Sequence, residues 1–162
     1  MAPVDPPTQK LSISSLEGTA ITVTAMYNPK EVQVDKSVPW TKQAHSKGDQ
    51  PSLEFSSADG RLMSFELMFD GFEAGTNVHT AFIQNLVKLA LVQDANGAED
   101  KKRPPKVVVK WPGGKLPDFQ GVIESVSTSY TMFLPDGTPV RATCRVAIRE
   151  ASHLSVHKNI VP

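Results

Sequence analysis

The sequence predicts a mainly β protein, an antiparallel β-sandwich or small barrel with one flanking α-helix. Thirteen prolines and ten glycines among 162 residues are typical of a chain that turns often. Several short segments alternate apolar and polar side chains, whereas only one segment has helical spacing. We expect a single domain over residues 10–150, with a flexible N-terminal arm at 1–9 and a C-terminal tail at 151–162.

The clearest local signal is a long β-hairpin at residues 119–150. Pro135, Asp136 and Gly137 are a turn signature, because proline fixes φ, aspartate can accept a hydrogen bond from nearby backbone, and glycine tolerates a positive φ. The turn divides two segments in which side chains alternate. After the turn, apolar residues alternate with a more polar set that includes Arg141, Thr143, Arg145 and Arg149. Before it, one parity holds Val122, Val126, Tyr130 and Met132, and the other holds Ser125, Ser127, Ser129 and Thr131.

Because strand side chains alternate between two faces, one face of this hairpin is predicted to be buried. The opposite face, with its three arginines, should meet water, a channel or another subunit. Glu124 and Glu150 on the same hairpin are candidate partners for the arginines.

The remaining elements follow from shorter patterns. A hairpin is expected around Glu17-Gly18 and a short strand at 32–38. Residues 61–69 are apolar on both parities apart from two positions, which predicts a strand covered on both faces. A helix is expected over 77–93, capped by Asn77, with Phe82, Leu86 and Leu89 as its apolar stripe.

Residues 41–52 are polar and have no periodicity, which predicts a loop. Loops of this kind often carry contacts to partners. Lys42, His45, Lys47 and Asp49 are its candidate interface residues. We expect the loop to be extended or poorly ordered in the free subunit and to become ordered on a neighbour.

Composition and motifs argue against several functions. Seventeen basic residues balance seventeen acidic ones, so bulk charge favours neither nucleic acid nor an anionic membrane. Cys144, the single cysteine, falls on the apolar parity of its strand and is expected to be buried. The four histidines and the Asp70/Glu73 pair do not form a set that predicts catalysis or metal binding. We therefore expect no enzyme activity and no cofactor, and the sequence shows neither a signal peptide nor an apolar span.

Several segments in order resemble the tube-protein family of contractile injection systems. They include Tyr27-Asn28-Pro29, Leu62-x-x-x-Glu66-Leu67-x-Phe69-Asp70, Gly121-Val122-Ile123-Glu124-Ser125 and, most specifically, the stretch FLPDGTPVRA at 133–142. The resemblance covers roughly residues 10–150 and implies a tail-tube or Hcp-like fold assembled as a hexameric ring. The most similar members join the central spike or hub to the inner tube.

That resemblance also implies the neighbours of the chain. They would be further copies of itself, inner tube rings, the spike or hub protein, and baseplate or sheath components. The protein would be cytoplasmic during assembly and then part of a phage-tail-like particle, without inserting into a membrane. Many relatives carry a peptidoglycan-binding LysM module after this domain, whereas only about a dozen residues follow the last expected strand here.

Two other interpretations fit the residues. One is a monomeric small β-barrel that binds a ligand. The other is an accessory domain of a hydrolase. Oligomeric state separates a ring from the monomeric barrel.

Overall fold

Seven strands form one antiparallel sheet in the computed structural model, which describes residues 9–43 and 48–154. Their order across the sheet is β2-β1-β7-β8-β9-β6-β3. The bounds are β1 Ser12–Ser15, β2 Thr22–Thr24, β3 Val32–Asp35, β6 Leu62–Asp70, β7 Val107–Lys110, β8 Phe119–Phe133 and β9 Pro139–Glu150. Two more strands, β4 (Trp40–Lys42) and β5 (Leu53–Phe55), pair only with each other.

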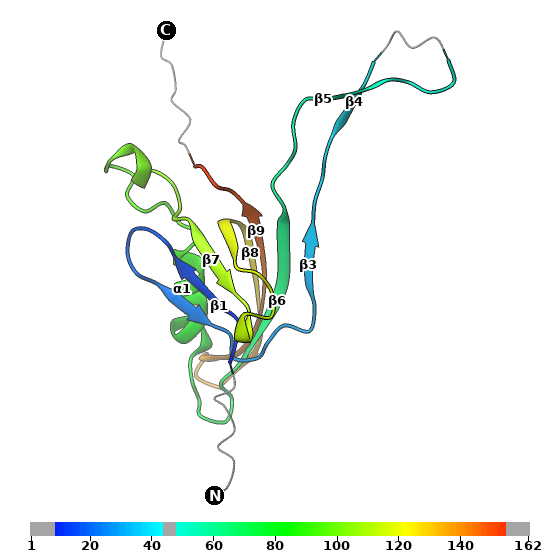
Figure 1. Ribbon diagram of the computed structural model, residues 1–162. Coiled ribbons are helices and arrows are strands. Elements are labelled where there is room, and N and C mark those ends of the chain that lie inside the picture. Colours follow the sequence, from blue (N-terminus) through cyan, green and yellow to red (C-terminus); the bar gives the residue numbers. More distant parts are fainter. Residues whose placement is uncertain (1–8, 44–47, 155–162) are drawn as a thin grey trace, which may run out of the picture.

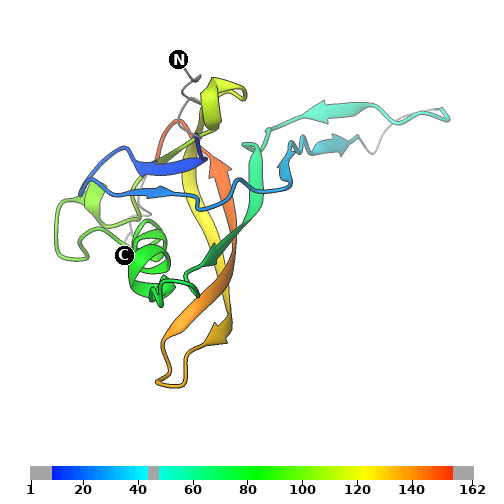
Figure 2. The same cartoon turned by 90° about the horizontal axis from the view of Figure 1, so that it is seen from below.

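The main sheet curls around the helix α1 (Gln84–Lys88). In Figure 2, β1 and β2 run along one side, β6, β8 and β9 form the other, and α1 lies in the angle between them. The two outermost strands, β2 and β3, do not pair with each other in the described residues, so the curled sheet stays open. The predicted mainly β fold with one helix is confirmed.

The core fills the inside of this curl. Its fully buried side chains come from the sheet and from the helix region, and the largest are Leu11, Ile13, Leu67, Phe69, Val78, Ile83, Leu86, Leu89 and Ile148. Cys144 is also fully buried, and burial raises the pKa of its thiol. The predicted burial of Cys144 is therefore confirmed, and a buried thiol with a raised pKa is poorly reactive.

The β8–β9 hairpin forms where the sequence predicts it, with the alternation of β9 as expected. Val140, Ala142, Cys144, Val146 and Ile148 are all fully buried. In the connecting turn, Asp136 Oδ1 accepts a hydrogen bond from the Thr138 backbone at 3.0 Å. Gly137 has a φ of 92°, a left-handed conformation that favours glycine.

The sequence predicts that Val122, Val126, Tyr130 and Met132 of β8 share one face, and this is wrong for Val122 and Met132. The register passes from Ile123 opposite Ile148 to Ser125 opposite Ala147, so Glu124 is an extra residue in a bulge. Val122 consequently lies opposite Arg149 on the outer face, and a second irregularity places Met132 opposite Arg141. Val126 and Tyr130 do face inward, opposite Val146 and Ala142.

β6 is covered on one face only, contrary to the prediction for residues 61–69. Met63, Phe65, Leu67 and Phe69 are buried in the core. On the other face Glu66 and Met68 are exposed within the single chain. Apolar residues at alternate and intervening positions of β6 therefore do not show that both faces of the strand are buried within the single chain.

The helical segment is shorter than the predicted 77–93. A π-helical turn, His79–Ile83, leads directly into α1, and Asn77 Oδ1 accepts hydrogen bonds from the backbones of His79 and Thr80 as a capping residue would. After Lys88 the regular helix ends: Ala90 and Leu91 donate to the Val87 and Lys88 carbonyls in tighter turns, and Gln93 and Asp94 then donate backbone hydrogen bonds to Arg103 and Lys101. Leu86 and Leu89 are buried as predicted, whereas Phe82 is half-buried and stacks on Phe69 with ring centroids 4.7 Å apart.

Between β3 and β6 the chain leaves the body as a paired ribbon, here called the arm (the described residues 36–43 and 48–60). Figure 1 shows it projecting away from the sheet on the side opposite α1. Its ladder pairs Trp40 with Phe55 and Lys42 with Leu53, and Gln43 continues the ladder by donating to the Ser52 carbonyl at 2.8 Å. The predicted loop at 41–52 thus begins and ends within a paired ribbon.

Two short 3-10 turns, Glu99–Lys101 and Pro112–Gly114, complete the described chain. The first lies in the charged loop that precedes Pro104-Pro105. The second follows the strand β7 and contains two consecutive glycines with positive φ.

Candidate assembly surfaces

The outer face of the sheet carries three cross-strand ion pairs, here called the ion-paired face. Arg141 contacts Asp70 at 3.1 Å, Arg145 contacts Glu66 at 3.8 Å, and Arg149 contacts Glu124 at 3.2 Å. Two of the pairs are dictated by register, because Arg141 lies opposite Asp70 and Arg145 lies opposite Glu66. The third depends on the bulge in β8, which supplies Glu124. Each arginine of β9 on this face thus has an acidic partner.

The three pairs differ in geometry. Arg141 donates from both Nε and Nη2 to Asp70 Oδ2, at 3.3 and 3.1 Å. A backbone hydrogen bond from Phe72, together with Arg141, lowers the pKa of the Asp70 carboxyl. Arg145 and Glu66 form the loosest pair, with side chains 73% and 56% exposed. This central position is the one most open to an outside partner.

The side chains between the pairs are mainly small and polar, although Val122 and Met132 of β8 lie opposite Arg149 and Arg141 on this face. Register places Ser125, Ser127 and Ser129 of β8 opposite Ala147, Arg145 and Thr143 of β9. Met68 is the large exposed apolar residue of β6 on this face. The ion-paired face is therefore hydrophilic and balanced in charge, unlike the unbalanced arginine band that β9 alone would present.

The sequence correctly predicts that Arg141, Arg145 and Arg149 share the outer face of β9. It predicts only one of their three acidic partners. Glu124 does pair with Arg149, whereas Glu150 pairs with Arg61 at 2.6 Å. Arg61 lowers the pKa of Glu150 through that hydrogen bond. Asp70 and Glu66 were not expected as partners, because nothing local links β6 to β9.

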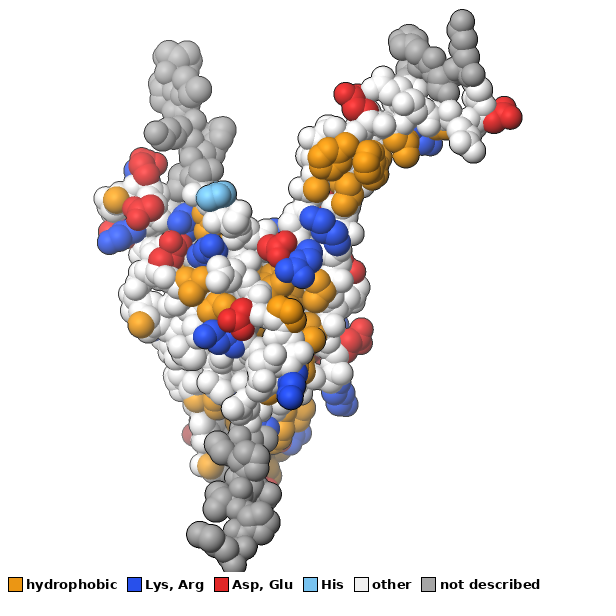
Figure 3. All heavy atoms as spheres, in the orientation of Figure 1, with side chains coloured by type: hydrophobic (Ala, Val, Ile, Leu, Met, Phe, Trp, Pro, Cys, Tyr) orange, Lys and Arg blue, Asp and Glu red, His pale blue; other side chains and the backbone are white. Residues whose placement is uncertain are grey.

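The arm presents a second surface, here called the arm's apolar face. Trp40, Leu53 and Phe55 are 53%, 54% and 56% exposed, and register places them on one side of the ribbon. The rings of Trp40 and Phe55 pack against each other with centroids 5.4 Å apart. Figure 3 shows hydrophobic side chains gathered along the arm where it leaves the body. Nothing in the described part of this protomer covers them.

Two of the four candidate loop residues, Lys42 and Asp49, lie in the described part of the arm. Lys42 is in β4, and Asp49 is exposed beyond the paired part of the arm. His45 and Lys47 lie outside the described residues. The apolar face itself was missed, although Trp40-x-Lys42 and Leu53-x-Phe55 show a period of two on either side of the polar stretch.

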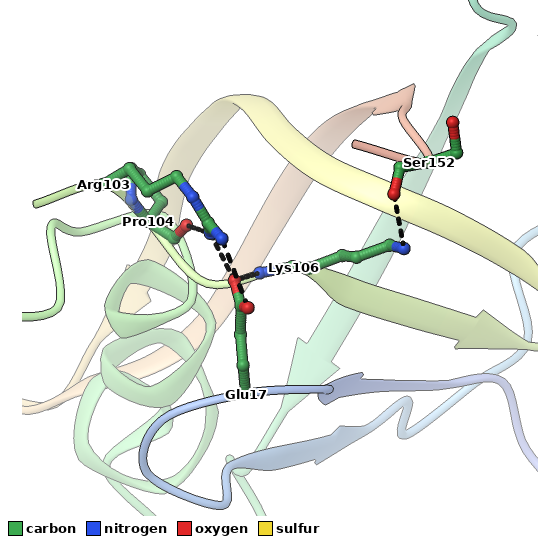
Figure 4. Close-up of polar contacts among 5 residues, drawn as sticks. All are labelled: Glu17, Arg103, Pro104, Lys106 and Ser152. Carbon is green, nitrogen blue, oxygen red and sulfur yellow. Dashed lines mark hydrogen bonds and ion pairs between the residues drawn. The ribbon is translucent and has the colours of Figure 1, made fainter. Parts of the chain in front are cut away.

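A partly buried ion pair between Arg103 and Glu17 lies on another part of the molecule. Figure 4 shows Glu17, in the β1–β2 turn, holding Arg103 and Lys106. Arg103 donates from both Nη1 and Nη2 to the Glu17 carboxylate, and the Lys106 backbone donates to it at 2.8 Å. The hydrogen bond from Arg103 is the main cause that lowers the pKa of Glu17. This contact joins the β1–β2 turn to the loop that precedes β7.

A groove of about 840 Å³ lies beside this contact. Its lining includes Thr19, Ile21, Lys88, Leu91 and Val92. It contains no converging nucleophile and base, and the residues around it are mixed in character.

The described histidines and the Asp70/Glu73 pair do not converge on a catalytic or metal site. Asp70 is engaged by Arg141 and by the Phe72 backbone, and His79 Nδ1 shares a hydrogen bond of 2.6 Å with the Tyr130 hydroxyl. No cluster of three or more possible metal ligands occurs within residues 9–43 and 48–154. Within those same ranges, no helix has the length and apolar character needed to cross a membrane.

Comparison with known proteins matches this sequence to one family. A structure described as the tail of an empty GTA particle with C6 symmetry aligns over 92% of this chain and 96% of its own, with 14% identity and a TM-score of 0.43. A comparison with curated proteins gives no match. The family model for the contractile injection system tube protein matches residues 8–158, nearly the whole sequence. The chain therefore belongs to the contractile injection system tube protein family, whose members are structural parts of phage-tail-like particles.

Proposed function

We propose that this protein is a structural subunit that forms a hexameric ring and joins the central spike or hub to the inner tube. Family membership supports a role in the tube of a contractile injection system. The proposed neighbours are inner tube rings, the spike or hub protein, and baseplate or sheath components. Assembly would begin in the cytoplasm, before the ring becomes part of the particle.

The observation that carries this proposal is the arm's apolar face. Three large side chains, Trp40, Leu53 and Phe55, are each more than half exposed on a ribbon that projects from the body. Burying a side chain of this size contributes about 1.5–3 kcal/mol, so leaving three in water is costly for an isolated protein. Contiguous exposed apolar surface of this kind marks protein–protein contact. A neighbouring subunit that covers the arm would gain this energy.

The ion-paired face supports the same assembly. A sheet with one buried face and one polar face can line a water-filled channel when copies are arranged in a ring. The face combines small side chains with compensated charges, which leaves it wettable along the length of β9. We assign Arg141, Thr143, Arg145 and Arg149 to this channel wall.

Size-exclusion chromatography with light scattering tests the proposal. The wild-type chain should form a species of about six protomers, and a Trp40→Ser/Phe55→Ser variant should shift toward the 17.6 kDa monomer. A Thr41→Ser/Glu54→Gln variant, altered on the opposite side of the same ribbon, should assemble like the wild type. A wild-type protein that stays monomeric at high concentration contradicts the ring and favours the ligand-binding module.

Location is a separate measurement. Negatively stained particles that carry a tagged copy of this chain should show the tag between the spike and the first tube ring. A tag distributed along the whole tube would assign the chain to the tube body, and the joining role would be wrong.

A further inference from the structure

The ion-paired face has a feature that assembly alone does not require. Three arginines follow one strand at every fourth residue, which on an isolated strand would make a positive stripe. Asp70 and Glu66 from β6, and Glu124 from the β8 bulge, cancel this stripe one for one. The acids come from two different strands, and one of them is placed only by a register irregularity.

Stability is a weak explanation for these pairs. All three lie at the surface, and exposed ion pairs contribute about 0–1 kcal/mol each. The Arg145–Glu66 pair has its atoms 3.8 Å apart and both side chains more than half exposed, so it should contribute least of the three. The pairing therefore matters less for the stability of the fold than for what the arginines can bind.

That consequence concerns polyanions. A protein binds nucleic acid mainly by neutralising phosphates with free arginine or lysine and releasing the condensed counterions. Here a phosphate approaching Arg141, Arg145 or Arg149 meets a carboxylate 3.1 to 3.8 Å from each guanidinium group. The repulsion by that carboxylate removes the net gain. The arginines still form hydrogen bonds at a hydrated surface, but they do not act as phosphate-binding sites.

We propose that Asp70, Glu66 and Glu124 determine the specificity of this face by preventing it from binding nucleic acid and other polyanions. The inference rests on the proposed function only in identifying the face as a channel wall. In that setting, a polyanion would neither stick to the wall nor be drawn into it. The property itself belongs to the face in any oligomeric state.

Binding of a short, fluorescently labelled double-stranded DNA, measured by anisotropy at several salt concentrations, tests the proposal. The wild type should show no saturable binding at 50 mM salt. The variant Asp70→Asn/Glu66→Gln/Glu124→Gln frees three arginines and should bind with a log–log salt slope of about −2.7, which is about a 40-fold loss between 50 and 200 mM salt. Asparagine at 70 keeps an amide oxygen for the Phe72 backbone, so the local turn is preserved.

Two further variants make the result specific. Glu66→Gln/Glu124→Gln leaves the Asp70 pair intact and should give a shallower slope of about −1.8. Asp59→Asn/Glu73→Gln/Asp118→Asn makes the same change in net charge at three exposed acids with no ion pair in the described structure, and it should bind no better than the wild type.

Each other outcome overturns the proposal. Wild-type binding comparable to that of the triple variant would show that the pairs do not block phosphate. A triple variant that folds, as shown by circular dichroism, and still fails to bind would show that the arginines are not the potential site. Equal gains in the control variant would assign the effect to bulk charge. Light scattering on the same samples reports ring formation separately, so loss of the ring and failure of this inference are distinguishable.

Discussion

At the scale of single residues, Glu17 shows how one side chain joins distant parts of the chain. Its carboxylate binds the Arg103 guanidinium and the Lys106 backbone, which are 86 and 89 residues away. Such a contact is absent in the unfolded chain, so the ionised form of Glu17 is favoured specifically by folding. The lowered pKa of Glu17 is therefore a statement about stability.

Acid should weaken the fold through this residue. Because the folded-state pKa lies below the ordinary value of 4.5, the stabilisation is fully present above pH 4.5 and is lost as the pH falls through the folded-state pKa. Glu17→Gln should lower the free energy of unfolding by about 1–2 kcal/mol at pH 7. Its stability should also depend less on pH below 4.5 than that of the wild type. Urea denaturation at pH 7 and at pH 3.5 measures both effects, and a parallel loss in both proteins would contradict this role.

At the scale of elements, the sequence predicts strands well when their pattern is local and unbroken. The alternation in β9 identifies its buried face residue by residue, because a period of two is all that a regular strand requires. The same rule fails in β8, where the extra residue Glu124 reverses the parity without leaving a sign in the amino acid types. The acidic partners from β6 could not be assigned either, since Asp70 and Arg141 are 71 residues apart and meet only through long-range register.

The predicted C-terminal end of the helix is wrong for a related reason. Apolar spacing continues to Leu89, but Ala90 and Leu91 bond back to Val87 and Lys88 in tighter turns, and the backbone at 93–94 bonds to the loop at 101–103. Tertiary contacts decide such ends more often than intrinsic preference does. The sequence predicts a loop at residues 41–52 of the arm because this stretch is polar, and the apolar side of the ribbon consists of only three residues that flank it, Trp40, Leu53 and Phe55.

Packing of the helical segment gives an element-scale prediction. Leu86 is fully buried, so Leu86→Ala should lower the free energy of unfolding by about 2–5 kcal/mol. Phe82 is only half-buried, and Phe82→Ala should therefore cost less than a full core truncation, about 2–3 kcal/mol, mainly through its lost stacking on Phe69. Chemical denaturation of the two variants checks the order. A larger loss for Phe82→Ala would show that the stacked ring, not the buried leucine, anchors the helix.

At the scale of the whole molecule, the two candidate surfaces lie on different parts of the protein and have opposite chemistry. The arm's apolar face projects from the body and gains energy when it is covered. The ion-paired face gains little from being covered, since its charges are already compensated and solvated. A ring in which the arm contacts a neighbour and the ion-paired face remains wet satisfies both surfaces.

The role of the ion-paired face can be tested by reversing its charges. Arg141→Glu/Arg145→Glu/Arg149→Glu places three new carboxylates beside Asp70, Glu66 and Glu124. Because these positions are at the surface, the isolated protomer should stay folded. Six copies around a ring would nevertheless concentrate negative charge on one wall, and we expect weaker ring stacking or impaired passage of cargo, with partial recovery at high salt.

A matched pair of variants separates loss of pairing from loss of arginine. Arg145→Glu alone creates a like-charged contact with Glu66, whereas Arg145→Glu together with Glu66→Arg restores an opposite-charge pair at the same register position. Light scattering and particle imaging should show the single variant impaired and the swapped variant close to the wild type. If the triple variant assembles normally and its particles still inject, the face meets ordinary solvent and the channel assignment is wrong. If the swapped variant is as impaired as the single one, the arginine itself, and not the balance of charge, is what the assembly requires.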